Sequence, residues 1–174
     1  MSPETIPAAV RLHHHAYVTN DQEATRRFYE EVVGLPLVAT WTEASDQEYC
    51  HTFFGLGDGS GLAFFQFADQ KYSEEMAPPV AFSPFRHVAL LVDAESQIAI
   101  RERAEAAGFG TLTQDHGYCK SLYMQDPNGL VLEFTVDHPE VDKINTLRRD
   151  NAHLDLARWL SGDHSNNNNW RAES

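Results

Sequence analysis

Two histidines and one glutamate in this sequence have the chemistry of a metal site. His14 and His87 each lie in an apolar, strand-like run, and Glu133 lies among apolar residues in the segment 129–134. An isolated carboxylate in such a strand is costly to bury unless a positive group compensates it. A divalent cation held by two imidazoles and one carboxylate provides that charge and keeps coordination positions open, as in non-haem Fe(II) enzymes that use oxygen. Zinc, nickel and manganese use related ligand sets.

Each of these residues also has an ordinary structural interpretation. A lone strand histidine is more often a core or rim residue than a ligand, and Glu133 can form an ion pair with Arg86 or Lys120. The coincidence of all three favours the metal hypothesis. The two histidines precede Asp21 and Asp93 by seven and six residues, at matching places in two similar halves of the chain.

The elements that would position these residues occur twice. Residues 12–19 and 85–92 are strand-like, and each run is followed by a helical stretch that stops at a glycine, Gly34 or Gly108. The separation from strand histidine to glycine is 20 residues in one copy and 21 in the other. Such agreement in order and spacing indicates a duplicated module.

The boundaries of each module follow from caps and turns. Asn20 and Glu23 have the spacing of a capping box for the first helix, and Asp93 is the expected cap of the second. Three short β-rich runs follow each helix, so both halves are predicted to be βαβββ. These runs lie around residues 37–41, 48–54 and 61–67 in the first copy, and around 111–113, 119–125 and 130–136 in the second.

We therefore expect an α+β protein whose paired domain spans residues 1–136, with modules at about 12–67 and 85–136. The intervening residues 69–84 contain three of the eight prolines and are expected to form a linker or a flap over a pocket. Residues 137–174 are expected to be a C-terminal helical extension that ends in a frayed polar tail. Its helices have a packing or dimerisation role, so a homodimer is one possible assembly.

Composition argues against several classes of partner. The 174 residues carry 13 basic and 26 acidic side chains, a formal charge of −13, which repels nucleic acid and anionic membranes. No apolar run approaches the roughly 20 residues of a membrane span. Residues 1–10 lack the pattern of a secretory signal, so we expect a cytoplasmic location. Cys50 and Cys119 are too far apart for a CxxC motif, and Cys119 is expected to be a packing residue.

Several segments resemble the vicinal oxygen chelate superfamily, the paired βαβββ proteins that include glyoxalase I, fosfomycin-resistance enzymes, bleomycin-binding proteins and extradiol ring-cleaving dioxygenases. The resemblance implies a half-open mixed β-barrel, the glyoxalase/bleomycin resistance/dioxygenase fold. It also implies metal ligands on the first and last strands of the modules, which here are His14, His87 and Glu133. The implied cofactor is a divalent metal, Fe(II) first and Mn, Ni or Zn as alternatives. The matching segments are residues 14–21, 27–35, 87–93 and 121–133.

The second module is also similar to the extradiol dioxygenase signature. His116, Tyr123, the turn at residues 126–129 and Glu133 follow its order, although Gln114 stands where that pattern has a smaller or branched residue. The resemblance implies that His116 and Tyr123 are catalytic and hydrogen-bond to bound oxygen or to a substrate oxyanion. Their alternatives are a loop histidine and a half-buried strand tyrosine.

Two features depart from known relatives. Gln66 is aligned with Glu133 by the repeat, where glyoxalase I has a carboxylate as fourth ligand, and a neutral amide is a poorer ligand. Gln66 is thus either a weak ligand or a polar pocket wall, and it counts against glyoxalase I activity. Ring-cleaving enzymes of this type usually carry a further acid–base histidine late in the first module or just beyond it, but no histidine occurs between His51 and His87.

The leading hypothesis is a metal-dependent enzyme that binds a small molecule through two adjacent oxygens and is most similar to an extradiol dioxygenase, an oxidoreductase. The first alternative is a non-redox metalloenzyme: an isomerase, a glyoxalase-like lyase or a thiol transferase that stabilises an enediolate or alkoxide. The second is a small-molecule binding or resistance protein without turnover. The intact set of two histidines and a glutamate argues against that second alternative.

Overall fold

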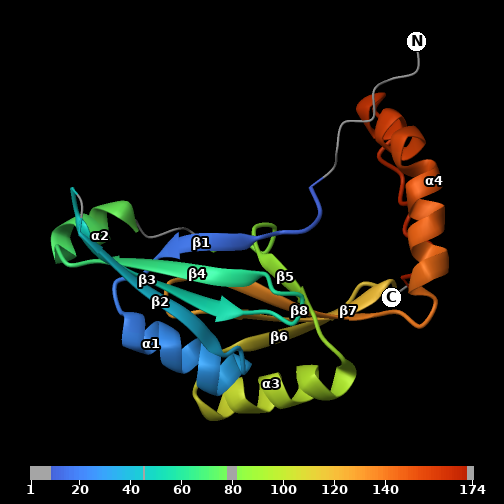
Figure 1. The fold of residues 1–174 in the computed structure, drawn as a ribbon. Helices are drawn as coiled ribbons and strands as arrows, with labels where there is room; N and C mark the ends of the chain where they lie inside the picture. Colours follow the sequence, from blue (N-terminus) through green and yellow to red (C-terminus); the bar gives the residue numbers. More distant parts are fainter. Residues whose placement is uncertain (1–8, 45, 78–81, 172–174) are drawn as a thin grey trace. The chain divides into compact units, whose positions relative to one another are not determined.

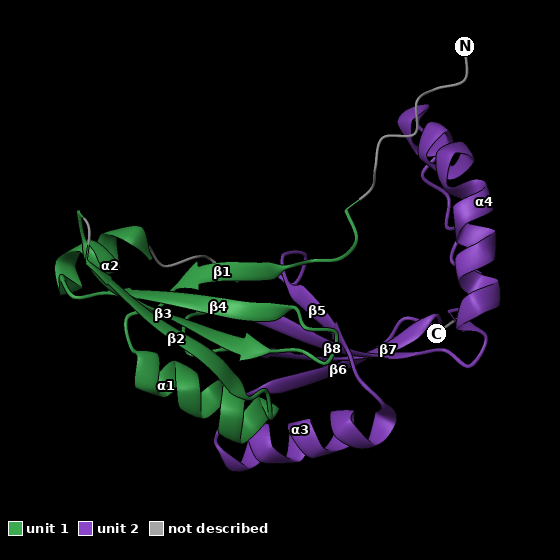
Figure 2. Ribbon diagram, in the orientation of Figure 1, with its two compact units in different colours: residues 1–82, 126–130 green, residues 83–125, 131–174 purple. Residues whose placement is uncertain are grey.

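A computed structural model describes residues 9–44, 46–77 and 82–171. These residues form two four-stranded mixed sheets with helices, with strand orders β1-β4-β3-β2 and β5-β8-β7-β6 (Figure 1). The predicted α+β class and the duplicated βαβββ order are confirmed. The chain divides into two compact units: unit 1 comprises residues 1–82 and 126–130, and unit 2 comprises residues 83–125 and 131–174 (Figure 2).

The sheet of unit 1 is built on an alternating pattern of side chains. Phe54, Leu62 and Phe64 point to the same face and are fully buried with Phe28 and Tyr29 of the first helical segment. The elements are β1 (His14–Val18), α1 (Gln22–Arg27), the π-helical segment η1 (Phe28–Val33), β2 (Leu37–Ala44), β3 (Glu48–Gly55), β4 (Gly61–Phe67) and α2 (Gln70–Met76).

The first helix begins one residue later than the expected cap. Asp21 is the N-cap, and its side chain accepts a hydrogen bond from the Ala24 amide at 2.9 Å. The predicted capping box of Asn20 and Glu23 is therefore wrong, because Glu23 instead pairs with two arginines on the next turn. The predicted stop is confirmed: Gly34 ends the helical segment with φ of 91°, a conformation that favours glycine.

The sheet of unit 2 repeats this design. Leu122, Leu132 and Phe134 are buried on one face with Ile100 and Ala104 of the helix. As predicted, Asp93 caps that helix by accepting from the Ser96 amide at 2.7 Å. The elements are β5 (Val88–Leu91), α3 (Ala94–Ala106), β6 (Thr111–Asp115), β7 (Cys119–Gln125), β8 (Val131–Asp137) and α4 (Val141–Leu160).

The segment expected to be a linker contains a helix, α2. Asp69 caps it, and Ser73 Oγ accepts from the Phe67 amide at 2.9 Å, which holds the helix against the end of β4. Pro78 and Pro79, on which the expectation of a flap partly depended, lie outside the described residues.

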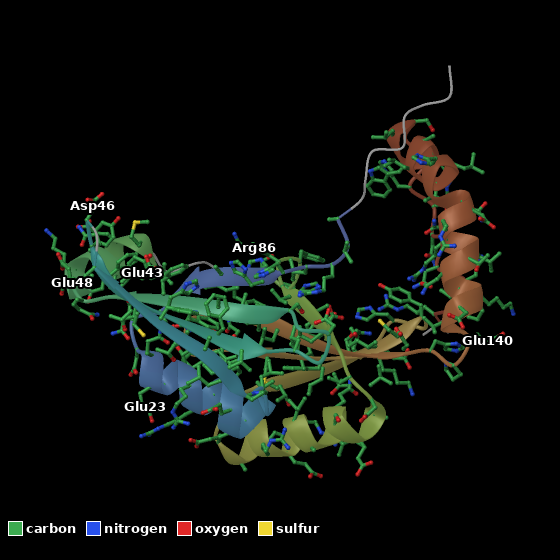
Figure 3. All side chains as sticks on the ribbon, viewed as in Figure 1. Glu23, Glu43, Asp46, Glu48, Arg86 and Glu140 are labelled. Atoms are coloured by element: carbon green, nitrogen blue, oxygen red, sulfur yellow. The ribbon has the colours of Figure 1, made fainter. Side chains whose placement is uncertain are left out.

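Glu43, Asp46 and Glu48 gather at the end of the β2–β3 hairpin and carry part of the negative charge (Figure 3).

The C-terminal extension is one helix, α4, which ends before Gly162 with φ of 94°. Ile144 is its buried residue, whereas Leu147, Leu154 and Trp159 are exposed. After the helix, Arg158 donates to the Ser165 side chain and backbone at 2.9 and 3.1 Å. In the described part of the chain, no helix is both long and apolar enough to cross a membrane.

Candidate metal site in the second sheet

Three of the five expected site residues share one face of the second sheet. Tyr123 on β7 and Ala89 on β5 are both directly opposite Glu133 on β8. Because side chains alternate along a strand, His87, two residues before Ala89, is on that same face. The buried side chains of Leu122, Leu132 and Phe134 lie on the opposite face. The alternation of side chains along each strand therefore places apolar residues in the core and brings His87, Tyr123 and Glu133 together on the other face.

Glu133 is buried, with 6% of its surface exposed, and it has two polar partners at short distance. Its Oε2 lies 2.7 Å from His87 Nε2, and its Oε1 accepts a hydrogen bond from the Tyr123 hydroxyl at 2.7 Å. Lys120, weighed above as an ion-pair partner of Glu133, lies 3.9 Å from Asp115 instead. The structure thus brings together two of the three expected ligands.

The other nitrogen of His87 explains how its ring is oriented. Nδ1 lies 2.7 Å from the Pro84 carbonyl oxygen, which can only accept, so Nδ1 carries a hydrogen and donates it. Such a contact to a backbone carbonyl commonly orients a metal-binding histidine. Nε2 is then the nitrogen that faces the carboxylate oxygen. A neutral imidazole nitrogen and a carboxylate oxygen are both ligands of divalent cations, so the chemistry of this pair fits such an ion.

The two expected catalytic residues are connected to this pair. His116 lies in the turn after β6, and its Nε2 is 2.9 Å from the Tyr123 hydroxyl oxygen. Burial, and then the hydrogen bond to Glu133, raise the pKa of Tyr123 to about 12. Tyr123 is therefore a protonated phenol at neutral pH, which can donate a hydrogen bond but is not a base.

His14 lies in unit 1 and is described within that unit. It is exposed on β1, its Nδ1 is 2.8 Å from His13 Nδ1, and its ring meets those of His51 and Phe53 edge-on. His51 Nε2 is buried without a hydrogen-bond partner among the described residues, and burial lowers the pKa of His51. Among the residues the structure describes, no three His, Cys, Asp or Glu side chains gather closely enough to hold a metal ion.

The strand register corrects the predicted alignment of Gln66 with Glu133. The residue after β1 donates its amide hydrogen to the Phe65 carbonyl at 2.8 Å, and the residue after β5 donates to the Thr135 carbonyl at 2.9 Å. Phe65 and Thr135 are therefore equivalent, and two residues earlier Ala63 is the equivalent of Glu133. A methyl group thus stands at the position where, by the resemblance, glyoxalase I has its fourth ligand.

Gln66 has a structural role instead. Its Oε1 accepts from the Gln22 amide at 3.0 Å, and its Nε2 donates to the Asn20 carbonyl at 3.3 Å. The Gln22 amide belongs to the first turn of α1, where backbone N–H groups have no partner within the helix. The side chain of Gln66 therefore holds the start of α1 to the end of β4.

Cys119 lacks the surroundings of a nucleophile. Its Sγ is 3.7 Å from Ser121 Oγ, and burial raises the pKa of the thiol. A raised pKa keeps the sulfur protonated at neutral pH, whereas a reactive cysteine needs a thiolate. These contacts support the packing role expected for Cys119.

Sequence reasoning missed two contributions to this site. The Pro84 carbonyl orients His87, and the C-terminal tail reaches His116, where Asn168 Nδ2 donates to its carbonyl at 3.0 Å. Arg171 Nη2 lies 3.2 Å from His116 Nδ1. A prolyl carbonyl and an asparagine-rich tail have no local pattern that indicates such contacts.

Comparison with known proteins agrees with this architecture. Residues 11–134 match the sequence model of the Glyoxalase/Bleomycin resistance protein/Dioxygenase superfamily. A probable lactoylglutathione lyase from Vibrio parahaemolyticus is 30% identical over 128 residues, which cover 71% of this chain and 88% of the relative.

Solved structures share the fold at lower identity. Glyoxalase I from Leishmania major, described as trypanothione-dependent, has a TM-score of 0.62 at 16% identity, covering 83% of this chain and 99% of that one. A mutant of the fosfomycin resistance protein FosX from Listeria monocytogenes, in complex with Mn(II), has a TM-score of 0.58 at 15% identity, covering 76% and 97%.

Proposed function

Because the chain belongs to the glyoxalase/bleomycin resistance protein/dioxygenase superfamily, we propose that it is a divalent-metal enzyme without a redox step. The reaction class is a lyase or isomerase that acts on a small molecule with two adjacent oxygens. The relative named as a probable lactoylglutathione lyase supports this class over ring cleavage. The solved structures at or below 16% identity support the fold alone.

One observation carries the proposal: His87 Nε2 and Glu133 Oε2 are 2.7 Å apart on the same face of the second sheet. The proposed protein ligands are these two residues and His14, the histidine of the first strand in the other module. A divalent ion held there supplies a Lewis acid that stabilises negative charge on a substrate oxygen. Three protein ligands would leave coordination positions open for two substrate oxygens.

The remaining residues act on this centre through hydrogen bonds. Tyr123 donates to Glu133 Oε1, which holds the carboxylate in one orientation, and His116 contacts the Tyr123 oxygen. Since the pKa of Tyr123 is raised to about 12, its proton stays on the phenol at neutral pH. Tyr123 is therefore not the proposed base for a proton transfer. The proposed role of Tyr123 is to orient Glu133.

Ala63 limits the proposal to a reaction class. The resemblance implies that glyoxalase I has a carboxylate ligand at this position, and the methyl group of Ala63 cannot replace it. The metal would therefore have one protein ligand fewer than in glyoxalase I. For this reason we propose lyase or isomerase chemistry on adjacent oxygens, rather than the specific substrate of the relative.

Ring cleavage is a second candidate, and a specific contact favours it. The extradiol signature resemblance gives catalytic roles to His116 and Tyr123, and these two side chains lie within hydrogen-bond distance of each other. In that case the metal would be Fe(II) and the substrate a catechol. The absence of histidine from residues 52–86 argues against this candidate.

The two candidates differ in metal and in oxygen use, so one experiment separates them. Metal-depleted protein is loaded without oxygen with Mn(II), Ni(II), Zn(II) or Fe(II). It is then assayed with the hemithioacetal of methylglyoxal and glutathione, with an epoxide plus a thiol, and with a panel of catechols. We expect turnover of the hemithioacetal with Mn(II) or Ni(II) and no oxygen uptake, whereas turnover of the epoxide and thiol alone would indicate a thiol transferase and contradict the lyase or isomerase class. Catechol turnover with Fe(II) and stoichiometric oxygen uptake would instead establish ring cleavage. Failure to bind any of the four ions would contradict both candidates.

A further inference from the structure

The C-terminal tail contacts the turn that carries His116. Asn168 donates to the His116 carbonyl at 3.0 Å, and the backbone of Trp170 lies against Gly117. Gly117 has φ of +80°, and a Cβ at this position would collide with the Trp170 carbonyl. Glycine is therefore required both by the turn and by the close approach of the tail. The tail also lines a cavity of about 660 Å³ with Asp115 and Cys119.

Arg171 is the tail residue that touches the His116 ring. Its Nη2 lies 3.2 Å from His116 Nδ1 and 3.4 Å from the Asp115 carbonyl oxygen. A guanidinium has only donors, so Nδ1 must accept and cannot carry a hydrogen. The hydrogen of neutral His116 is then on Nε2, which lies 2.9 Å from the Tyr123 oxygen.

This tautomer decides the direction of the next hydrogen bond. Tyr123 has one hydroxyl hydrogen, and it can donate to either Glu133 or His116. When His116 Nε2 carries a hydrogen and donates, the Tyr123 hydrogen is available for Glu133 Oε1 at 2.7 Å. If the hydrogen were on Nδ1, it would point at the N–H donors of the guanidinium and be repelled by them. Nε2 would then be an acceptor, and the Tyr123 hydroxyl could donate to Nε2 instead of to the buried carboxylate.

We propose that Arg171, in the C-terminal tail, is a positioning residue that holds neutral His116 as the Nε2–H tautomer. The Tyr123 hydroxyl then keeps donating its hydrogen bond to Glu133. The resulting relay runs from Arg171 through His116 and Tyr123 to Glu133. Its effect on catalysis rests on the proposed function, but the tautomer is a property of the chain alone.

The tautomer is measured in the full, metal-free chain labelled with ¹⁵N at histidine. Long-range ¹H–¹⁵N correlations in alkaline buffer, where imidazole is neutral, identify the protonated ring nitrogen of His116. We expect the Nε2–H form in the parent protein, a clear increase of the Nδ1–H form in Arg171→Met, and restoration in Arg171→Lys, which keeps a donor. Arg149→Met, at an exposed arginine of α4, is the matched control and should match the parent. An Nδ1–H parent, or an Arg171→Met variant with an unchanged tautomer, would overturn the proposal.

Activity gives a second readout on the metal-loaded protein. We expect kcat of Arg171→Met to fall about 10-fold, with KM unchanged, as for other groups that orient a metal-site residue indirectly. A fall in kcat without a change of tautomer would overturn the role of Arg171 and leave the proposed function intact. If the parent protein has no turnover, the proposed function fails while the tautomer measurement still decides the inference.

Discussion

The two sheets place different chemistry on the same scaffold. His14 and His87 occupy equivalent positions before or at the start of the first strand of each module. Each packs edge-on against an equivalent aromatic ring: His14 against Phe53, with ring centroids 5.6 Å apart, and His87 against Tyr123, with centroids 5.8 Å apart. The distance between the histidine ring and its aromatic neighbour thus differs by only 0.2 Å between the two modules.

The difference lies in the residues that face each other across the last two strands. Tyr123 is opposite Glu133 in unit 2, and Phe53 is opposite Ala63 in unit 1. In the described part of the first sheet, Phe53 and Ala63 therefore provide neither the hydroxyl nor the carboxylate that Tyr123 and Glu133 provide in the second. The cross-strand pair of Tyr123 and Glu133 therefore distinguishes the second sheet from the first, since the strands and the histidines are common to both modules.

Removal of the Glu133 carboxylate is expected to have the largest effect on the difference between the two sheets. Glu133→Gln keeps the shape of the side chain and an acceptor for Tyr123, but it removes the negative charge that a cation requires. We expect Mn(II) affinity, measured by isothermal titration calorimetry, to fall by at least about 100-fold, since even groups outside the ligand set cost 10–100-fold. Glu48→Gln, at an exposed glutamate of β3, should bind Mn(II) as the parent does. Unchanged affinity in Glu133→Gln would exclude this carboxylate as a ligand.

Tyr123→Phe makes the second sheet resemble the first. The hydrogen bond to Glu133 is lost while the ring and its contact with His87 remain, so we expect kcat to fall about 10- to 100-fold with the fold intact. Steady-state kinetics of the metal-loaded variant measure this loss. The reciprocal change Phe53→Tyr is the control, and it should leave kcat unaltered because Ala63 offers no acceptor. Full activity in Tyr123→Phe would show that the hydroxyl has no role.

Gln66→Leu separates the structural role of this amide from the ligand role considered for it. The Gln22 amide would lose its partner, so we expect the free energy of unfolding in urea to fall by about 1–2 kcal/mol. Mn(II) affinity should stay unchanged, because Ala63 and not Gln66 is equivalent to Glu133. Weaker Mn(II) binding with parental stability would contradict the register-based assignment.

The equivalent turns of the two modules should respond to pH with opposite signs. Burial raises the pKa of Asp126, whereas hydrogen bonds from Ser60 lower the pKa of Asp58. The contribution of Asp126 to folding stability is fully present below the pKa of an unfolded Asp, about 3.9. This contribution is lost as pH rises through the raised pKa of Asp126 in the folded protein. That of Asp58 is present above the unfolded pKa and is lost as pH falls through its folded value.

Urea unfolding between about pH 2 and pH 7, a range that includes the unfolded carboxyl pKa of about 3.9, tests this contrast. The stability of Asp126→Asn relative to the parent should increase as pH rises, because the variant lacks a buried carboxyl that must ionise. The stability of Asp58→Asn relative to the parent should decrease as pH rises. Parallel trends in the two variants would contradict one of the two directions.

Local sequence patterns were sufficient for the modules and for part of the site. The helix stop at Gly34 and the cap at Asp93 could be predicted because each depends on a few neighbouring residues, namely on positive φ and on one side-chain acceptor. The apolar neighbours of Glu133 also indicated a buried carboxylate, and Glu133 is 6% exposed. The cap of the first helix was displaced by one residue because Asn20 and Asp21 are both good caps, and local spacing cannot choose between them.

Contacts between distant segments could not be predicted in this way. The equivalence of Ala63 with Glu133 is defined by pairing between strand residues 47 positions apart in the first module and 44 in the second. A shift in a hairpin alignment changes this equivalence without altering any local pattern. The approach of Arg171 to His116 joins residues 55 positions apart. Local propensity specifies which segments form strands and helices, because it depends on backbone and neighbouring side chains. The partners of those segments, and hence which polar groups meet, are decided only when the whole chain packs and pairs its hydrogen bonds.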